Sequence, residues 1–201
     1  MVGGTGPRGT RTLGGPRRIT TASTVDIDLT VDDLGMRAAL EVAQQGLDRG
    51  ELPIGAVVVS DGEVLGSSHT EEVTQRRLLV HAELLALEEA DRQDGWDRRS
   101  ATLYTTLEPC LMCVGATATA LVGRIVWAIE SDCDLAGRVC REWDSGRPPE
   151  LPQLHLPEVT GPVGDAEATE LFRAYVDARG DSCDPFVRWA ATLIGHERSV
   201  R

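Results

Sequence analysis

The spacing of hydrophobic positions predicts a chain that alternates between helices and strands. From Val31, apolar residues recur every three or four positions, which predicts a helix of about four turns ending near Gly50. A β-branched run over 55–60, an Asp-Gly turn and a second short run over 64–66 predict a β-hairpin. Residues 67–80 are mostly polar and predict a loop.

The second half of the chain continues the alternation. The expected elements are a helix over 81–91, a strand over 101–106, a helix from Pro109 to about Leu121 and a strand over 124–129. They are followed by a loop region over 131–152 with one short helical turn, an outer strand over 154–160, and helices over 166–178 and 185–194. The central order is therefore strand, strand, helix, strand, helix, strand.

Length and composition predict one folded domain with extensions at both ends. The chain has 201 residues, of which 41% are hydrophobic, and this suits a single compact core. Residues 1–25 are rich in Gly, Thr and Arg and lack both acidic residues and periodicity, which predicts a disordered tail. The domain is expected over 26–180, and 181–201 forms a C-terminal helical extension.

Charge and cysteine content narrow the function classes. The 20 cations are all Arg, so a Walker phosphate loop and a Schiff-base lysine are excluded. With 32 acidic residues the net charge is −12, which disfavours attraction to a polyanion. No apolar run reaches the ~18 residues of a membrane helix and no signal peptide is present, so we expect a cytoplasmic protein. Five cysteines, an odd number, favour metal or thiol chemistry over disulfides.

Two short motifs carry the candidate chemistry. His81 and Glu83 form an H-x-E, and Pro109 is followed by Cys110 and Cys113 in a P-C-x-x-C. These are the signatures of zinc deaminases. One imidazole and two thiolates supply three of four tetrahedral zinc positions and leave the fourth open for water, as a catalytic site requires. Both motifs fall at expected helix N-termini, where the helix dipole favours thiolates.

The motifs predict hydrolytic deamination with Glu83 as general acid and base. Zinc in such a site lowers the pKa of water from 15.7 towards about 7. Glu83 would take the proton of the water and deliver protons to a ring nitrogen and to the departing amine. Two alternatives remain open, namely a redox C-x-x-C pair and a non-catalytic, zinc-stabilised interaction protein.

Three stretches, residues 53–59, 81–87 and 101–116, resemble the cytidine deaminase-like superfamily. The resemblance is closest to the branch of bacterial tRNA adenosine deaminases and guanine deaminases. It implies an α/β fold, a three-layer α/β/α sandwich with a mixed sheet of about five strands, assembled as a homodimer or tetramer. It also implies that 26–180 is a zinc deaminase catalytic domain, and 181–201 is a candidate lid.

The chain departs from the family where a base is bound. The base-binding Asn of the family falls at Thr70, and Leu78-Leu79-Val80 replaces the Asp-Pro-Thr before the zinc histidine. The expected substrate contacts are Thr70, Val57, His69, Ala82 and Pro109. Leu79 and the aromatic residues Phe186 and Trp189 could also line the pocket. The polar run 132–134 could reach its edge, although an ordinary polar loop is the favoured interpretation of that run.

The resulting hypothesis is a Zn²⁺-dependent hydrolytic deaminase of a small free heterocycle, a purine base or nucleoside. Its partners are expected to be this small molecule and a second copy of the chain, with no membrane. The alternative substrate is adenosine in a tRNA anticodon loop. The acidic domain disfavours that alternative, although Arg76, Arg77, Arg98 and Arg99 could form a local basic cluster.

Overall fold

The computed structural model describes residues 17–19, 29–144, 155–180 and 183–195. Most of the expected tail, 1–25, lies outside these residues, as do part of the loop region 131–152 and both ends of the segment 181–201. Among the described residues, no helix is both long and apolar enough to span a membrane.

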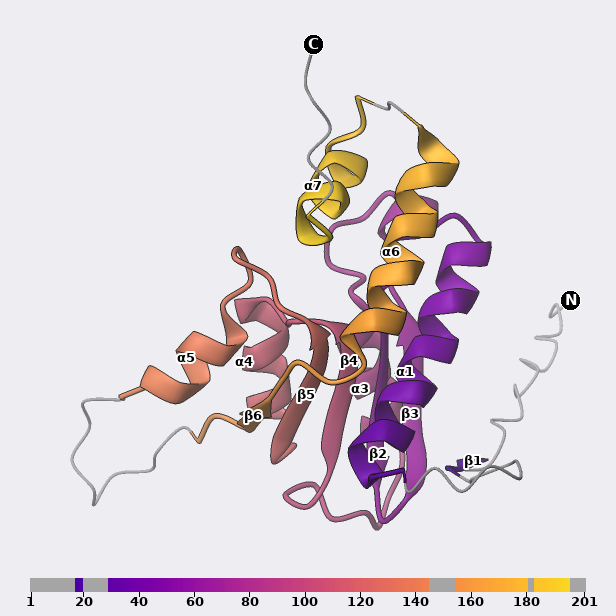
Figure 1. Ribbon diagram of the computed structural model, residues 1–201. Coiled ribbons are helices and arrows are strands. Elements are labelled where there is room, and N and C mark those ends of the chain that lie inside the picture. The colour runs from indigo at the N-terminus through magenta and orange to yellow at the C-terminus, as the bar shows by residue number, and fades with distance from the viewer. Residues whose placement is uncertain (1–16, 20–28, 145–154, 181–182, 196–201) are drawn as a thin grey trace, which may run out of the picture.

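A mixed β-sheet forms the centre of the fold (Figure 1). Its strands are β1 (Arg17–Arg18), β2 (Gly55–Ser60), β3 (Glu63–His69), β4 (Thr102–Leu107), β5 (Arg124–Ile129) and β6 (Glu158–Thr160). In the order β1-β3-β2-β4-β5-β6, the first four strands pair antiparallel, whereas β4, β5 and β6 pair parallel. The expected mixed sheet is confirmed, with five strands and the two-residue β1 at its edge.

Helices cover both faces of the sheet (Figure 1). They are α1 (Val31–Asp48), α2 (Glu72–Gln75), α3 (Ala82–Asp91), α4 (Leu111–Thr119), α5 (Ala136–Glu142), α6 (Asp165–Arg179) and α7 (Pro185–Leu193). Helices α1 and α6 pack on one face, α3 and α4 lie on the other, and α7 packs against α6. This arrangement confirms the three-layer α/β/α sandwich.

Helix α1 is fixed to the sheet by polar contacts at its start and by close packing along its length. Thr30 and Asp33 form a capping box, and Asp32 makes a bidentate ion pair with Arg124 of β5, with N···O distances of 2.7 Å. A Cβ at Gly55 would lie 2.4 Å from the backbone of Ala39, so only glycine lets the helix pack this close to β2.

The parallel pairing of β4 and β5 places the two motifs together. His81 is the N-cap residue of α3, and Cys110 is the N-cap residue of α4, directly after β4. Strand β4 returns the chain to the end of the sheet at which α3 begins. The N-termini of α3 and α4 therefore both lie near the carboxyl end of β4. The helices begin one and two residues later than the sequence predicts, at Ala82 and Leu111.

The expected loop over 67–80 is wrong in two respects. Strand β3 continues to His69, and α2 forms within the polar run. The cause lies outside this segment, because the fully buried carboxylate of Glu51 accepts hydrogen bonds from the backbone N–H groups of Val73 and Thr74. Helix α5 also extends over seven residues, longer than the single expected turn, while β6 is shorter than the expected outer strand.

Candidate metal centre and substrate cavity

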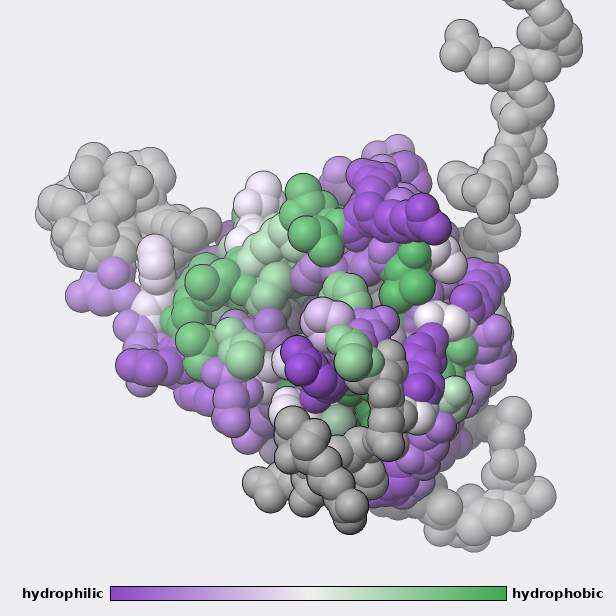
Figure 2. Space-filling model, turned by 90° about the horizontal axis from the view of Figure 1, so that it is seen from above, coloured by the Kyte–Doolittle hydropathy of each residue, from purple (hydrophilic) through white to green (hydrophobic). Residues whose placement is uncertain are grey.

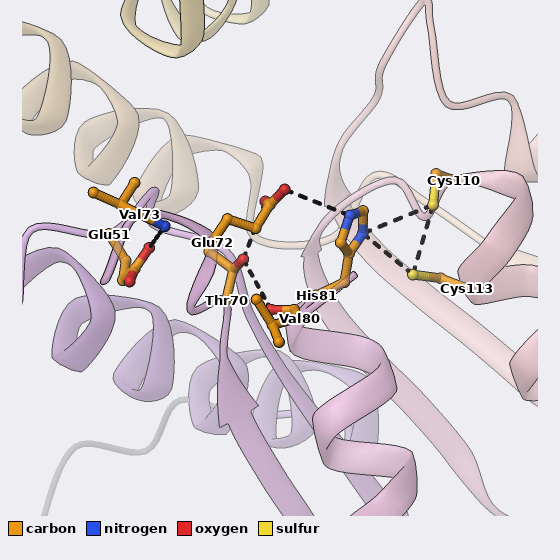
Figure 3. A network of polar contacts seen from close by, with 8 residues as sticks. All are labelled: Glu51, Thr70, Glu72, Val73, Val80, His81, Cys110 and Cys113. Atoms are coloured by element: carbon orange, nitrogen blue, oxygen red, sulfur yellow. Dashed lines mark hydrogen bonds and ion pairs between the residues drawn. The ribbon is translucent and has the colours of Figure 1, made fainter. Parts of the chain in front are cut away.

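The ligand atoms of His81, Cys110 and Cys113 lie close together near the carboxyl end of the central strand β4. Nδ1 of His81 lies 3.8 Å from Sγ of Cys110 and 3.5 Å from Sγ of Cys113, and the two sulfurs are 3.7 Å apart (Figure 3). Two Zn–S bonds of about 2.3 Å in a tetrahedron place the sulfurs about 3.8 Å apart, so the spacing fits zinc. The three residues that would hold the ion are those expected from the motifs.

The same three groups perturb one another electrostatically. The hydrogen bonds of Cys110 with Cys113 and His81 lower its thiol pKa to about 4, against the opposing effect of burial. The hydrogen bond with Cys110 raises the pKa of His81 to about 9, and the pKa of Cys113 is raised by Cys110 and by burial. A thiol pKa lowered in this way favours the thiolate form of Cys110, which is the form that binds a divalent cation.

Glu83 lies beside this triad in the first turn of α3, with only 3% of its surface exposed. Burial raises its pKa to about 7. Its Oε2 has no hydrogen-bond partner in the described part of the chain, although the side chain lines a cavity. A buried carboxyl group with an unpaired oxygen at a cavity wall is suited to exchanging protons with a molecule bound there.

The cavity next to the triad measures about 350 Å³ and combines an apolar wall with acidic groups. Its apolar lining is Leu52, Ile54, Leu107, Pro185, Phe186 and Trp189, and its remaining lining is Thr70, Glu72, His81, Ala82, Glu83, Glu108, Cys110 and Asp134. Among the described residues, no Arg side chain lines it. The cavity therefore suits a flat, uncharged or cationic ring that carries N–H donors.

Two of the five expected substrate contacts, Thr70 and Ala82, line this cavity, as do Phe186 and Trp189 of α7. Pro109 precedes Cys110 but is not among the lining residues. Asp134 reaches the cavity from the polar run that follows β5. The pKa of Asp134 is raised, chiefly by burial.

Val57, His69 and Leu79 are not among the residues that line the cavity. Val57 is 1% exposed and belongs to the hydrophobic core beneath the site. His69 is also buried, and both its ring nitrogens are engaged: Nδ1 lies 2.6 Å from the carbonyl oxygen of Thr70, and Nε2 lies 2.7 Å from Nη1 of Arg49. Leu79 is 65% exposed.

Two glutamates at the cavity were not expected from the sequence. Glu108 accepts hydrogen bonds from the backbone N–H groups of Ser131 and Gly137, at 3.0 and 2.7 Å, and so fixes the loop that carries Asp134. The position of Glu108 directly before the P-C-x-x-C motif could have identified it from the sequence as a residue near the site. Glu72 of α2 lies in a polar run without periodicity, and nothing in that run distinguished it from its neighbours.

The arrangement of the three metal-ligating side chains agrees with the protein family that the sequence matches. Residues 29–129 match the family described as the cytidine and deoxycytidylate deaminase zinc-binding region, and this match spans half of the chain. The chain belongs to this family. The zinc cofactor expected from the motifs is thereby confirmed, because the family is zinc-binding and this chain retains the His and two Cys in ligating positions.

Relatives of this deaminase-family chain differ in what they act on or bind. The tRNA-specific adenosine deaminase of Bacillus subtilis strain 168 is 42% identical over 100 residues, which are 49% of this chain and 62% of the relative. The matched region thus spans less than two thirds of that protein's length.

Solved structures cover more of the chain. One, from a study of A-to-I editing by tRNA:A34 deaminases, is 28% identical with a TM-score of 0.58 and covers 68% of this chain and 97% of its own. Another, a mutant of the protein NE0047 in complex with 8-azaguanine, is 25% identical with a TM-score of 0.58. It covers 81% of this chain and 88% of its own.

Proposed function

We propose that this chain hydrolyses the amino group of a small free heterocycle, a purine base or nucleoside, and releases ammonia. The observation that carries this proposal is the cavity beside the zinc ligands, which α7 lines with Phe186 and Trp189 and which no described Arg side chain lines. Binding of a purine analogue, 8-azaguanine, by a structural relative supports it.

The chain's own residues perform the proton transfers and hold the ring. His81, Cys110 and Cys113 would hold a zinc ion, which would supply a water molecule acidic enough to lose a proton near neutral pH. Glu83 takes that proton and passes it to a ring nitrogen as the water oxygen bonds to the amino-bearing carbon. Glu83 then takes the proton of the hydroxyl group on that carbon and delivers it to the amine, the C–N bond breaks as the C=O bond forms, and a carbonyl compound and ammonia leave. The apolar wall positions the ring and keeps bulk water out.

The second candidate, adenosine in a tRNA anticodon loop, is favoured by the 42% identity to a tRNA-specific adenosine deaminase. The charges at the site oppose it, because Glu72, Glu83 and Asp134 line the cavity. In addition, two of the four Arg residues that could form a basic cluster lie far from the zinc site. Arg98 and Arg99 precede β4, whereas the zinc ligands Cys110 and Cys113 follow its other end, a strand length of roughly 20 Å away.

The substrate class is tested by measuring ammonia release from guanine, adenine, cytosine and their nucleosides, in parallel with inosine formation in an anticodon stem-loop. We expect turnover of at least one free heterocycle and no detectable inosine in the RNA at physiological salt. The zinc-loaded Glu83→Gln variant supplies the background rate. Efficient inosine formation without turnover of any free base or nucleoside would establish the second candidate.

Substitution of the α7 aromatics should weaken substrate binding without removing zinc. We expect Trp189→Ala and Phe186→Ala to raise KM by about tenfold each, because burial of an aromatic face against a ring contributes roughly 1–2 kcal/mol. Steady-state kinetics and zinc content measure the two effects separately. Arg188→Ala is the matched control, because Arg188 is exposed on the same helix and does not line the cavity. Wild-type KM values in all three variants would show that α7 does not contact the substrate.

We further propose that the protein is a cytoplasmic homodimer. Large exposed hydrophobic side chains adjoin both zinc motifs in the sequence, with Leu78 71%, Leu79 65% and Leu111 59% exposed. Hydrophobic residues also gather on the side of the molecule seen in Figure 2. Exposed apolar surface of this kind is typical of a protein–protein contact.

A further inference from the structure

The side chain of Glu72 lies between the zinc ligand His81 and Thr70 (Figure 3). Its Oε1 is 3.7 Å from Nε2 of His81, an ion-pair distance. Its Oε2 lies 3.2 Å from the hydroxyl oxygen of Thr70, which can donate a hydrogen bond to it. Only 10% of the side-chain surface is exposed. Neither the proton transfers nor the expected substrate contacts require this carboxylate.

Backbone contacts hold Glu72 in this position. The buried carboxylate of Glu51 accepts hydrogen bonds of 2.9 and 2.8 Å from the N–H groups of Val73 and Thr74, the two residues after Glu72. On the other side, the N–H of Glu71 donates to the carbonyl oxygen of Val80, at 3.0 Å. The segment around Glu72 is therefore tied to the end of α1 and to the residue before His81.

The two ring nitrogens of His81 face different partners. Nδ1 faces the sulfurs of Cys110 and Cys113, whereas Nε2 faces Glu72. A histidine that binds a metal through Nδ1 must carry its proton on Nε2, and a carboxylate beside Nε2 stabilises that tautomer and the ring orientation. The carboxylate also makes the ligating nitrogen more basic. Such outer-shell partners contribute 10–100-fold to metal affinity.

We propose that Glu72 is the positioning residue of the zinc site, its carboxylate facing Nε2 of His81 at ion-pair distance so that Nε2 keeps the proton and Nδ1 points to the metal, and that Thr70 holds Glu72. This inference rests on the zinc site of the proposed function. It gives Thr70 a different role from the base-binding residue expected at this position. The hydroxyl of Thr70 lies 3.2 Å from Oε2 of Glu72 and 3.3 Å from the carbonyl oxygen of Val80. Its single proton is therefore donated within the protein and not to a bound base.

Zinc affinity tests the proposal independently of catalysis. The dissociation constant is measured on the full chain by competition with a chromophoric chelator. We expect Glu72→Ala to weaken zinc binding about 10–100-fold. Glu72→Gln should weaken it less, because the amide oxygen still accepts a hydrogen bond while the charge is lost. Thr70→Val removes only the hydroxyl and should give a smaller loss than Glu72→Ala.

Glu71→Gln is the matched control, because it makes the same change one residue earlier on a side chain that does not line the cavity. Its zinc affinity should equal that of the wild type. A spectroscopic readout accompanies the titration: in the zinc-loaded wild type, the Nε2–H proton of His81 should be visible by NMR and protected from exchange with water. This protection should be lost in Glu72→Ala. Circular dichroism establishes that each variant is folded.

Three results would overturn the inference. Wild-type zinc affinity in Glu72→Ala, accompanied only by a higher KM, would make Glu72 a substrate contact. If Glu72→Ala does not fold, the inference would be overturned by wild-type zinc affinity and wild-type protection of the Nε2–H proton in both Glu72→Gln and Thr70→Val. A wild-type chain that binds no zinc would defeat the proposed function itself. That failure is distinguishable because it appears before any variant is compared.

Discussion

Cys113→Ala is expected to purify with almost no zinc and no measurable deaminase activity, whereas the wild type should hold about one zinc per chain. Cys113 is fully buried in the first turn of α4, and its sulfur lies 3.5 Å from Nδ1 of His81. Its removal leaves two protein ligands for an ion that needs three to stay bound while a coordination position remains open. His81→Ala should have the same effect. Elemental analysis and ammonia release measure the two losses.

The control for loss of a thiol is Cys133→Ala. Cys133 is exposed and lies outside the triad, so this variant should keep both zinc and activity. Zinc content is the decisive measurement for both variants, because activity can fall for many reasons. Full zinc content in both Cys113→Ala and His81→Ala would show that the ion is held elsewhere and that the ligand set is misassigned.

The zinc ligands were predictable from sequence because their geometry is local. Cys110 and Cys113 are three residues apart at a helix start, a spacing that puts both sulfurs on one side of the first turn. The only long-range requirement was that α3 and α4 begin at the same edge of the sheet. The hydrophobic pattern of β4 and β5 already predicted the strands that meet this requirement.

The cavity lining was less predictable because it depends on segments distant in sequence. The β-branched Val57 satisfied the apolar pattern of a pocket residue, but a central strand is covered on both faces, and its side chain lies in the core. The direction of the His69 ring depends on Arg49, twenty residues earlier, and on Gly46, where a Cβ would lie 2.8 Å from the Cβ of His69. Neither contact leaves a periodic signal.

Helix α2 shows the same limitation at the level of secondary structure. Its four residues contribute nothing to the hydrophobic core and have no side-chain cap of their own, so propensity and periodicity gave no reason to expect a helix. The N–H groups of Val73 and Thr74 are instead satisfied by Glu51, more than twenty residues away. The position of Glu72 at the cavity is a consequence of that tertiary contact. It became recognisable only when the contact was known.

Glu83→Gln should retain zinc and fold but lower kcat by at least ~10²-fold, the usual contribution of a positioned general acid and base. That factor corresponds to about 2.7 kcal/mol of transition-state stabilisation. Gln has nearly the same shape, so the buried site stays filled, but an amide cannot accept and return a proton. Because Oε2 of Glu83 has no protein partner in the described residues, the substitution breaks no hydrogen bond made by that oxygen. The loss should therefore appear in kcat, with KM and zinc content close to those of the wild type.

Glu88→Gln separates this effect from the loss of a carboxylate on α3. Glu88 lies on the same helix but is exposed and pairs with Arg92, so its variant should turn over at the wild-type rate. Stopped-flow or single-turnover measurements assign the loss in Glu83→Gln to the chemical step, because product release is not observed under those conditions. A near-normal single-turnover rate in zinc-loaded Glu83→Gln would transfer the proton shuttle to another acid at the cavity. Asp134 would then be the first to substitute, since it is the other acidic lining residue whose oxygens are not committed to the backbone or to His81 in the described structure.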